Sequence, residues 1–196
     1  MPSAQWTEVA YGNNRFVTIA YGSNQCAYSG DGVNWMISTM PASRNWQALG
    51  YGAGKFVALA YGTSIGAWSD DGETWTEFSL PVSTNWKCVT YGDGKFVAVA
   101  YNTSTMIYSE DGITWTKGTM PASRYWRYVR YCGDKFIAVA SVSSYSAYSS
   151  DGVTWITANM PVSTDWWRVA YGDGKIVAVA YNKNIAAYSE DGLSWR

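Results

Sequence analysis

The chain has 196 residues and a net charge of −1, with acidic and basic residues interspersed. This balance excludes the basic stripe with which nucleic-acid-binding proteins neutralise phosphates. No apolar run reaches the roughly 18 residues of a membrane-spanning helix, and no signal peptide precedes the first repeat. We therefore expect one domain that has neither a nucleic-acid nor a membrane partner.

A seven-residue segment recurs every 40 residues and organises the chain. In its third copy, residues 109–115, it reads Ser-Glu-Asp-Gly-Ile-Thr-Trp, and the other copies end at Trp35, Trp75, Trp155 and Trp195. A repeat of about 40 residues has the length of a propeller blade and buries its apolar face only by stacking on its neighbours. The sequence predicts an all-β, five-bladed β-propeller with four antiparallel strands per blade, formed by residues 1–196. The expected blades are at about 2–40, 41–80, 81–120, 121–160 and 161–196.

The third repeat shows the expected strands in order: residues 86–91, 95–101, 106–109 and 114–117. Asp93 and Gly94 lie between the first two strands, and Asp-Gly between apolar runs favours a type I′ hairpin turn. The second strand is apolar on both faces, which is typical of a strand packed between two layers. Five blades of four strands make about twenty short strands, and each blade is contiguous in sequence. Blades five and one should pack together and close the ring, with both termini at one seam.

The recurring segment resembles the Asp-box, or bacterial neuraminidase repeat, in a variant with one residue fewer between Asp and Gly. The preceding string, Tyr-Gly-x-Gly-Lys-Phe-Val-Ala-Val-Ala-Tyr, is similar to repeats of phage tail-associated and bacterial surface proteins. The blade count is shared with tachylectin-type lectins. These resemblances imply a propeller on a virion or outside the cell, as a monomer or as a module of a larger protein.

The aspartates of the recurring segment are predicted to be structural. A carboxylate before glycine in a tight turn accepts hydrogen bonds from the turn's own N–H groups. All five repeats have an aspartate at this position: Asp31, Asp71, Asp111, Asp151 and Asp191. Five copies fit a structural role repeated around the ring better than a single catalytic centre.

The three cysteines lie at different positions of the repeat, which argues against a disulfide framework and favours buried free thiols.

The sequence gives little support for catalysis. There is no histidine, so histidine-based catalysis and histidine metal sites are absent. The sialidase resemblance would imply arginines that converge from around a six-bladed ring, whereas four arginines crowd into repeats four and five. We expect no enzyme activity, no catalytic residues, no cofactor and no metal.

Most aromatic residues recur at fixed positions of the repeat and are interpreted as scaffold. Four of the five that do not recur lie in repeats four and five, beside several arginines. An aromatic ring next to a guanidinium suits sugar recognition. The candidate ligand-binding patch consists of Arg124, Tyr125, Arg127, Tyr128, Tyr145, Trp167 and Arg168. Tyr125 and Trp167 are the preferred contacts and Arg124 the preferred polar partner, and strand alternation predicts that Arg127 and Tyr128 point in opposite directions.

The sequence therefore favours a non-enzymatic, lectin-like module whose ligand is a glycan. Two alternatives stay open: a structural or protein-interaction propeller of a phage tail or secreted assembly, and a degenerate sialidase-like glycosidase.

Overall fold

The computed structural model describes residues 1–196, which form 17 strands joined by turns. The first two repeats each form a four-stranded antiparallel meander. The first sheet consists of β1 (Trp6–Gly12), β2 (Arg15–Ala20), β3 (Ser23–Ser29) and β4 (Met36–Arg44). The second consists of β5 (Trp46–Gly52), β6 (Lys55–Ala60), β7 (Thr63–Ser69) and β8 (Thr76–Thr84).

The third and fourth repeats share one six-stranded sheet. Its strands are β9 (Trp86–Gly92), β10 (Lys95–Ser109), β11 (Thr116–Cys132), β12 (Lys135–Ser141), β13 (Ser143–Ser149) and β14 (Ile156–Thr164). The long strand β11 pairs with β10 through its first part and with β12 through its second part. The fifth repeat forms a three-stranded sheet of β15 (Trp166–Gly172), β16 (Lys175–Ala180) and β17 (Ala186–Ser189).

The prediction of five four-stranded blades is therefore wrong, because the chain forms four sheets of four, four, six and three strands. Tyr125 explains part of the difference. It stands where the other repeats have Gln5, Asn45, Asn85 and Asp165, and a strand-forming residue in place of turn-forming ones lets β11 continue without a break. In the fifth repeat, Arg196 exchanges backbone hydrogen bonds with Tyr188, but no fourth strand follows.

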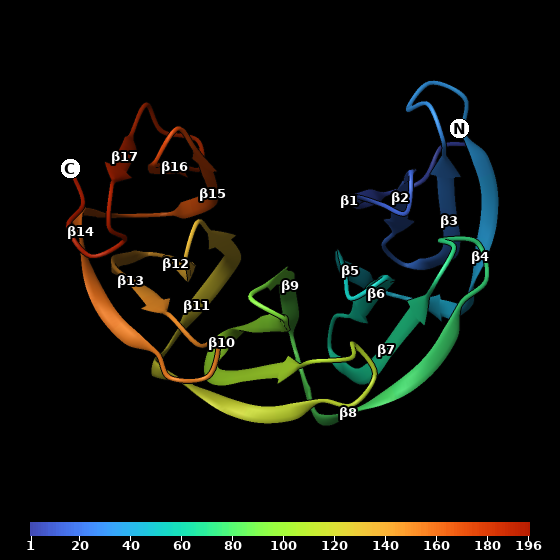
Figure 1. The fold of residues 1–196 in the computed structure, drawn as a ribbon, viewed down its shortest axis with the longest axis horizontal. Helices are drawn as coiled ribbons and strands as arrows, with labels where there is room; N and C mark the ends of the chain where they lie inside the picture. Colours follow the sequence, from blue (N-terminus) through green and yellow to red (C-terminus); the bar gives the residue numbers. More distant parts are fainter.

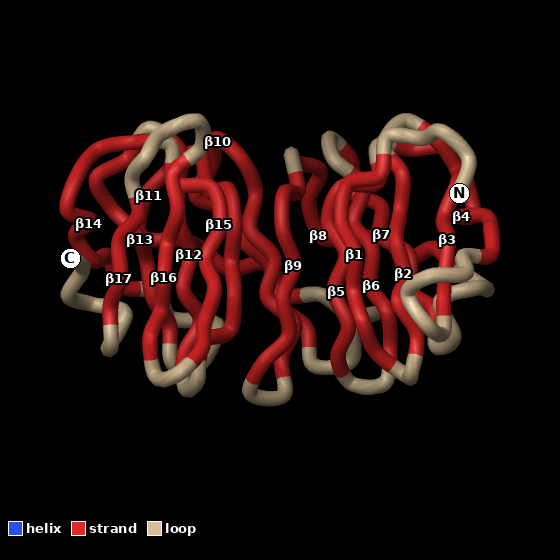
Figure 2. The backbone as a smooth tube through the Cα atoms, turned by 90° about the horizontal axis from the view of Figure 1, so that it is seen from above, coloured by secondary structure: helices blue, strands red, loops and turns tan.

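The sheets stand side by side in an arc that is open between the first and fifth repeats (Figure 1; Figure 2). Strands β1, β5, β9, the second part of β11, and β15 lie on the concave side, and β4, β8 and β14 lie on the convex side (Figure 1). The expected closure is thus also corrected: the termini lie apart, and the first and last sheets do not pack together (Figure 1). The rotation from one repeat to the next is too small for five repeats to complete a circle.

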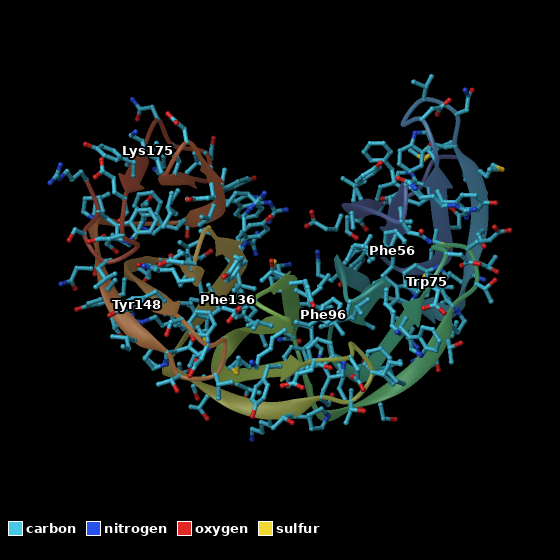
Figure 3. The ribbon with its side chains drawn as sticks, in the orientation of Figure 1. Phe56, Trp75, Phe96, Phe136, Tyr148 and Lys175 are labelled. Atoms are coloured by element: carbon cyan, nitrogen blue, oxygen red, sulfur yellow. The ribbon has the colours of Figure 1, made fainter.

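The core lies between successive repeats, in four clusters of 11 or 12 buried residues each. Every cluster contains a tryptophan from an inner strand and a phenylalanine or isoleucine from the next strand, such as Trp86 with Phe96. Phe56, Phe96 and Phe136 point into these layers (Figure 3). Burial of each such side chain contributes about 1.5–3 kcal/mol, so packing between repeats stabilises the arc. The three cysteines are buried and free, as predicted.

In each recurring turn, the aspartate carboxylate is hydrogen-bonded to groups of the same turn. In the third repeat, the carboxylate of Asp111 accepts hydrogen bonds from the N–H groups of Ile113 and Thr114 and from the Ser109 hydroxyl. The other four repeats have the same arrangement. In two places the first hairpin of a repeat contacts the turn of the next repeat: the Arg15 guanidinium donates to the Asp71 carbonyl, and the Lys135 ammonium donates to the Asp191 carbonyl. Asp93 and Gly94 have φ angles of 45° and 73°, as a type I′ turn requires.

Candidate functional site

A β-bulge near the start of every inner strand sets the geometry of the concave surface. The register between first and second strands shifts after Trp6, Trp46, Trp86, Trp126 and Trp166. A bulge adds one residue to a strand and breaks the simple alternation of its side chains. As a result, the successive residues Trp167 and Arg168 line the same small cleft. Strict alternation, which was expected for Arg127 and Tyr128, therefore does not describe this part of the strands.

The cleft lies where the inner strands begin, and we call it the channel mouth. It is lined by Glu8, Gln47, Lys87, Arg127, Trp167 and Arg168. Three of these side chains are cationic and one is anionic. Arg168 reaches across the concave side, and its guanidinium lies 3.5 Å from the Glu8 carboxylate. The lining of the mouth thus carries a net positive charge, and the negative charge of Asp165 also acts on Arg127 from outside the lining.

Aromatic rings hold the central arginine of the mouth. The guanidinium of Arg127 lies 3.5 Å from the centroid of the Trp167 ring and 5.7 Å from that of Tyr101. On its other side, Trp167 stacks on Tyr181 with a centroid distance of 4.4 Å and an interplanar angle of 26°. Lys87 lies 5.3 Å from the ring centroid of Tyr61. These contacts are cation–π pairs, which hold a cation against a ring face, and the Lys87 ammonium also donates a hydrogen bond to the side-chain oxygen of Gln47 at 3.2 Å.

The charges of the mouth influence one another. Burial lowers the pKa of Lys87, and the nearby guanidinium groups of Arg127 and Arg168 lower it further. Burial raises the pKa of Glu8, an effect that the charge of Arg168 opposes. The two guanidinium groups and the ammonium of the mouth therefore repel one another.

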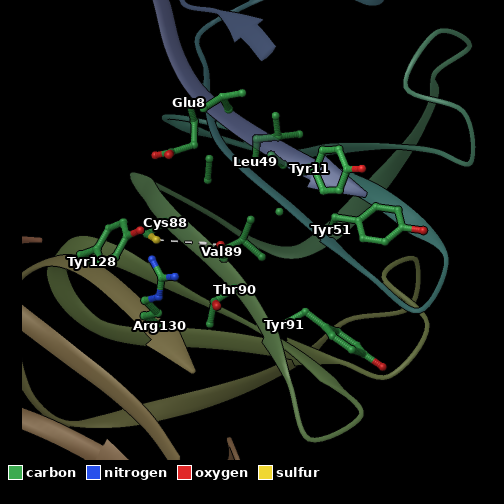
Figure 4. Close-up of a pocket in the computed structure, with 14 residues that line it drawn as sticks. Glu8, Tyr11, Leu49, Tyr51, Cys88, Val89, Thr90, Tyr91, Tyr128 and Arg130 are labelled. Carbon is green, nitrogen blue, oxygen red and sulfur yellow. Dashed lines mark hydrogen bonds between the residues drawn. The ribbon is translucent and has the colours of Figure 1, made fainter. Parts of the chain in front are cut away.

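A second cavity of about 260 Å³ continues along the inner strands below the mouth. Glu8, Cys88, Tyr128 and Arg130 lie at one end of this cavity, and Tyr11, Tyr51 and Tyr91 lie at the other (Figure 4). Burial raises the pKa of Cys88 to about 12, and its thiol donates to the Val129 carbonyl at 3.4 Å. A thiol held in this form is a poor nucleophile. Burial likewise raises the pKa of Tyr128 to about 12.

The structure separates the seven residues of the predicted patch into two groups. Arg127, Trp167 and Arg168 line the channel mouth. Tyr128 lies below them, with the Arg168 guanidinium 4.7 Å from its ring centroid, and Tyr125 reaches the site through Tyr101, at a ring distance of 4.8 Å.

Arg124 and Tyr145 form a separate pair. The Arg124 guanidinium lies 4.3 Å from the Tyr145 ring centroid, beside the pairing of Arg124 with Thr103 in β10. Neither residue lines the mouth, so Arg124 is not placed as the polar partner of Trp167.

Sequence reasoning missed Glu8, Gln47 and Lys87. The signal for Gln47 and Lys87 is visible when the repeats are aligned, because the residues at that position all differ: Thr7, Gln47, Lys87, Arg127 and Trp167. Glu8 lies at the next position, where the residues also all differ: Glu8, Ala48, Cys88, Tyr128 and Arg168. Tyr181 was interpreted as scaffold because its position is aromatic in four of five repeats, yet it supports Trp167.

The structure contains no group of three or more His, Cys, Asp or Glu side chains placed to hold a metal ion. It also contains no helix with the length and apolar character needed to cross a lipid bilayer.

No protein-family model and no curated protein matches the chain. The chain is, however, similar in fold to several solved structures. The chain superposes over 100% of its length on a streptogramin B lyase, with a TM-score of 0.88, 11% identity and 69% of that chain covered. For virginiamycin B lyase from Staphylococcus aureus, the TM-score is 0.89 at 10% identity, with 100% and 70% of the two chains covered. For YCF48 bound to a D1 peptide, the TM-score is 0.73 at 15% identity, with 98% and 66% covered.

These similarities correct the prediction that the chain is not an enzyme, since proteins of the same fold are lyases. A further solved structure is a catalytically inactive variant of the Staphylococcus aureus lyase in which alanine replaces a histidine. The present chain has no histidine, so it lacks the residue type that this lyase needs. None of the comparisons supports the Asp-box, phage-tail or lectin resemblance. What they show is that the chain has a β-propeller fold.

Proposed function

We propose that the channel mouth binds a carbohydrate that carries a carboxylate, such as a uronic or sialic acid. The observation that carries this proposal is the convergence of Lys87, Arg127 and Arg168 on one cleft with a single acidic side chain, Glu8. Three cations around one small cleft are costly unless an anion completes the site.

Arg127 is the proposed primary contact. Tyr101 and Trp167 hold its guanidinium by their ring faces, and its pattern of parallel N–H donors matches the two oxygens of a carboxylate. Lys87 supplies a second charge from the neighbouring inner strand. The half-buried rings of Tyr61 and Tyr101 lie at the edge of the cleft, where an aromatic face can cover the apolar side of a pyranose.

Trp167 acts through Arg127. Tyr181 stacks on its ring at 4.4 Å and Arg127 approaches the ring at 3.5 Å, and both cannot occupy the same face. Because both faces are covered, Trp167 is proposed to position the guanidinium and not to stack on the sugar.

Glu8 competes with the ligand. Its carboxylate lies 3.5 Å from Arg168, so an incoming carboxylate that takes this guanidinium leaves Glu8 beside a second anion. Burial already raises the pKa of Glu8, which favours uptake of a proton as the ligand binds.

Calorimetric titration with glucuronate and with glucose tests the proposal. We expect glucuronate to bind and glucose to bind far more weakly. Arg127→Ala should weaken glucuronate at least tenfold, since a hydrogen bond to a charged group contributes about 1.5–3 kcal/mol. Lys175→Ala is the matched control, because it removes a cation from an exposed hairpin outside the cleft. Equal binding of both sugars, or equal effects of both variants, contradicts the proposal.

An acidic peptide is the second candidate. The structure of YCF48 with a D1 peptide shows that a similar fold can hold a peptide, and the cations of the mouth suit acidic side chains or a C-terminal carboxylate. An array that carries acidic glycans and acidic peptides, competed with free glucuronate, distinguishes the two ligands.

A further inference from the structure

One position of the inner strands has a small side chain in every repeat except the fourth. The residues at this position are Ala10, Gly50, Thr90, Arg130 and Ala170. The first four of them line the cavity of about 260 Å³ that continues from the mouth. The small side chains leave this space open, and Arg130 is the single cationic side chain in its lining. Arg130 thus departs from the repeat at a position that borders a cavity.

The guanidinium of Arg130 has no carboxylate partner in the chain. The guanidinium groups of Arg15, Arg44 and Arg168 lie 3.6, 2.9 and 3.5 Å from a carboxylate oxygen, and aromatic rings hold that of Arg127. Arg130 makes neither kind of contact, and its side chain is exposed. A guanidinium in this state presents parallel N–H donors to the cavity, and their spacing matches the two oxygens of a carboxylate.

Arg130 lies close to the channel mouth. Burial raises the pKa of Tyr128, and the charges of Arg130 and Arg168 both oppose this effect. Figure 4 shows Arg130 at the same end of the cavity as Glu8 and Tyr128. Along β11, Arg130 follows Arg127 by three residues, which is a separation of about 10 Å in an extended strand. This separation favours two different carboxylates of one ligand over two oxygens of a single carboxylate.

Glu8 limits what can lie between these two carboxylates. It lines both the mouth and the second cavity, so the part of a ligand that joins the two sites meets its side chain. An ionised carboxylate accepts hydrogen bonds and repels another anion. The joining part should therefore carry hydroxyl groups and no negative charge. An oligomer of uronic acids has this pattern, because hydroxyl-bearing ring atoms separate its successive carboxylates.

We propose that Arg130 binds a second carboxylate, so that the ligand of the concave side is an oligomer of uronic acid with at least two charged units. This inference rests on the proposed function, in which Arg127 and Lys87 hold the first carboxylate. The second sugar unit lies over the small side chains of the first three repeats, which leave the cavity open. Two carboxylates on one molecule bind more tightly than one, because the second contact forms at a high effective concentration.

Calorimetric titration with three sugars tests the second subsite. The sugars are glucuronate, diglucuronate and glucuronosyl-glucose, which is a disaccharide of the same size with one carboxylate. Diglucuronate is expected to bind about tenfold more tightly than glucuronosyl-glucose, as for one further hydrogen-bonded charge pair. Arg130→Ala should remove this advantage, and it should weaken glucuronate much less than diglucuronate. Lys175→Ala is the matched control and should keep the advantage.

The variant Arg130→Ala is compatible with the strand, since the first and fifth repeats have alanine at this position. Its melting temperature should equal that of the unmodified protein, so that a loss of affinity reports on the ligand contact.

The outcomes separate this inference from the proposed function. If glucuronate binds but diglucuronate has no advantage over glucuronosyl-glucose, or keeps its advantage in Arg130→Ala, the second subsite is wrong and the mouth alone is the site. If none of the three sugars binds, the proposed function fails and this inference fails with it. Tighter binding of a dipeptide of two glutamates than of diglucuronate would assign both subsites to an acidic peptide, which also overturns the inference.

Discussion

The ring of Tyr91 fills the space beside the backbone of Gly52 in the preceding repeat, where any Cβ atom would overlap it. Tyr51 with Gly12 and Tyr131 with Gly92 repeat this relationship. A close approach of this kind requires glycine in the strand, and it sets how closely each sheet approaches the next.

Gly52→Ala is therefore expected to lower the free energy of unfolding by about 1–3 kcal/mol, the usual cost of overpacking a core. Gly172→Ala is the matched control, because it has the same place in the fifth repeat with nothing within 4 Å of the added Cβ. Urea denaturation of both variants checks this. Equal midpoints for the two would show that the tyrosine does not require glycine.

Replacement of the turn tryptophans should be more costly. Trp115 and Trp75 are 7% and 8% exposed and belong to the core clusters. Trp115→Ala and Trp75→Ala should each lower the free energy of unfolding by about 3–5 kcal/mol, the range for deletion of a large buried aromatic. Thermal denaturation measures the loss, and an unchanged melting temperature would contradict a structural role for these residues.

Acid should destabilise the protein only at low pH. The N–H groups of Ser194 and Leu193 lower the pKa of Asp191 to about 2, from an ordinary value of 3.8. Since the folded state depresses this pKa, the stabilisation is complete above about pH 4 and is lost as the pH falls toward 2. Burial opposes the same shift at Asp111, yet the N–H groups of Thr114 and Ile113 prevail and its pKa is also about 2.

Urea midpoints at pH 5, 4, 3 and 2 measure this effect. Most of the loss is expected between pH 4 and 2, and Asp191→Asn should make it smaller, because an amide does not titrate there. A midpoint that falls steeply between pH 6 and 4 instead would assign acid sensitivity to other groups.

The local parts of the fold could be predicted from the sequence, and the closure could not. Asp93-Gly94 specifies its hairpin by the backbone angles that it allows, and the two apolar faces of residues 95–101 specify a sandwiched strand. Closure depends on the small rotation between neighbouring sheets, which is set by packing such as that of Tyr91 on Gly52. No single residue encodes that rotation, so the count of repeats could not show that the arc stays open.

The candidate site was predictable in part for a similar reason. Arg127, Trp167 and Arg168 depart from the repeat and were identified on that basis. Lys87 and Glu8 come from other repeats, and only the bulge and the curvature of the arc bring them to the same cleft. Arg124 and Tyr145 also depart from the repeat, but they pair with each other on a different part of the sheet. Departure from a repeat therefore indicates candidates without specifying which of them converge.

The affinity of the channel mouth for a carboxylate should depend on the charge of Lys87. Burial and the charges of Arg127 and Arg168 lower the pKa of this lysine below its ordinary value of 10.5. The ammonium attracts a carboxylate and the neutral amine does not, so affinity should fall as the pH rises through the lowered pKa. A bound anion stabilises the ammonium, and binding near that pH should take up a proton.

Titrations with glucuronate from pH 7 to 10, in two buffers of different ionisation enthalpy, measure both the affinity and the proton uptake. Lys87→Arg is the matched variant, since it keeps the positive charge over this range and retains Tyr61 beneath the side chain. It should bind with nearly constant affinity, while the unmodified protein loses affinity with rising pH. Lys87→Met should bind weakly at every pH. If the unmodified protein and Lys87→Arg lose affinity in parallel, the titrating group is another side chain of the mouth, and Lys87 is not a contact of the carboxylate.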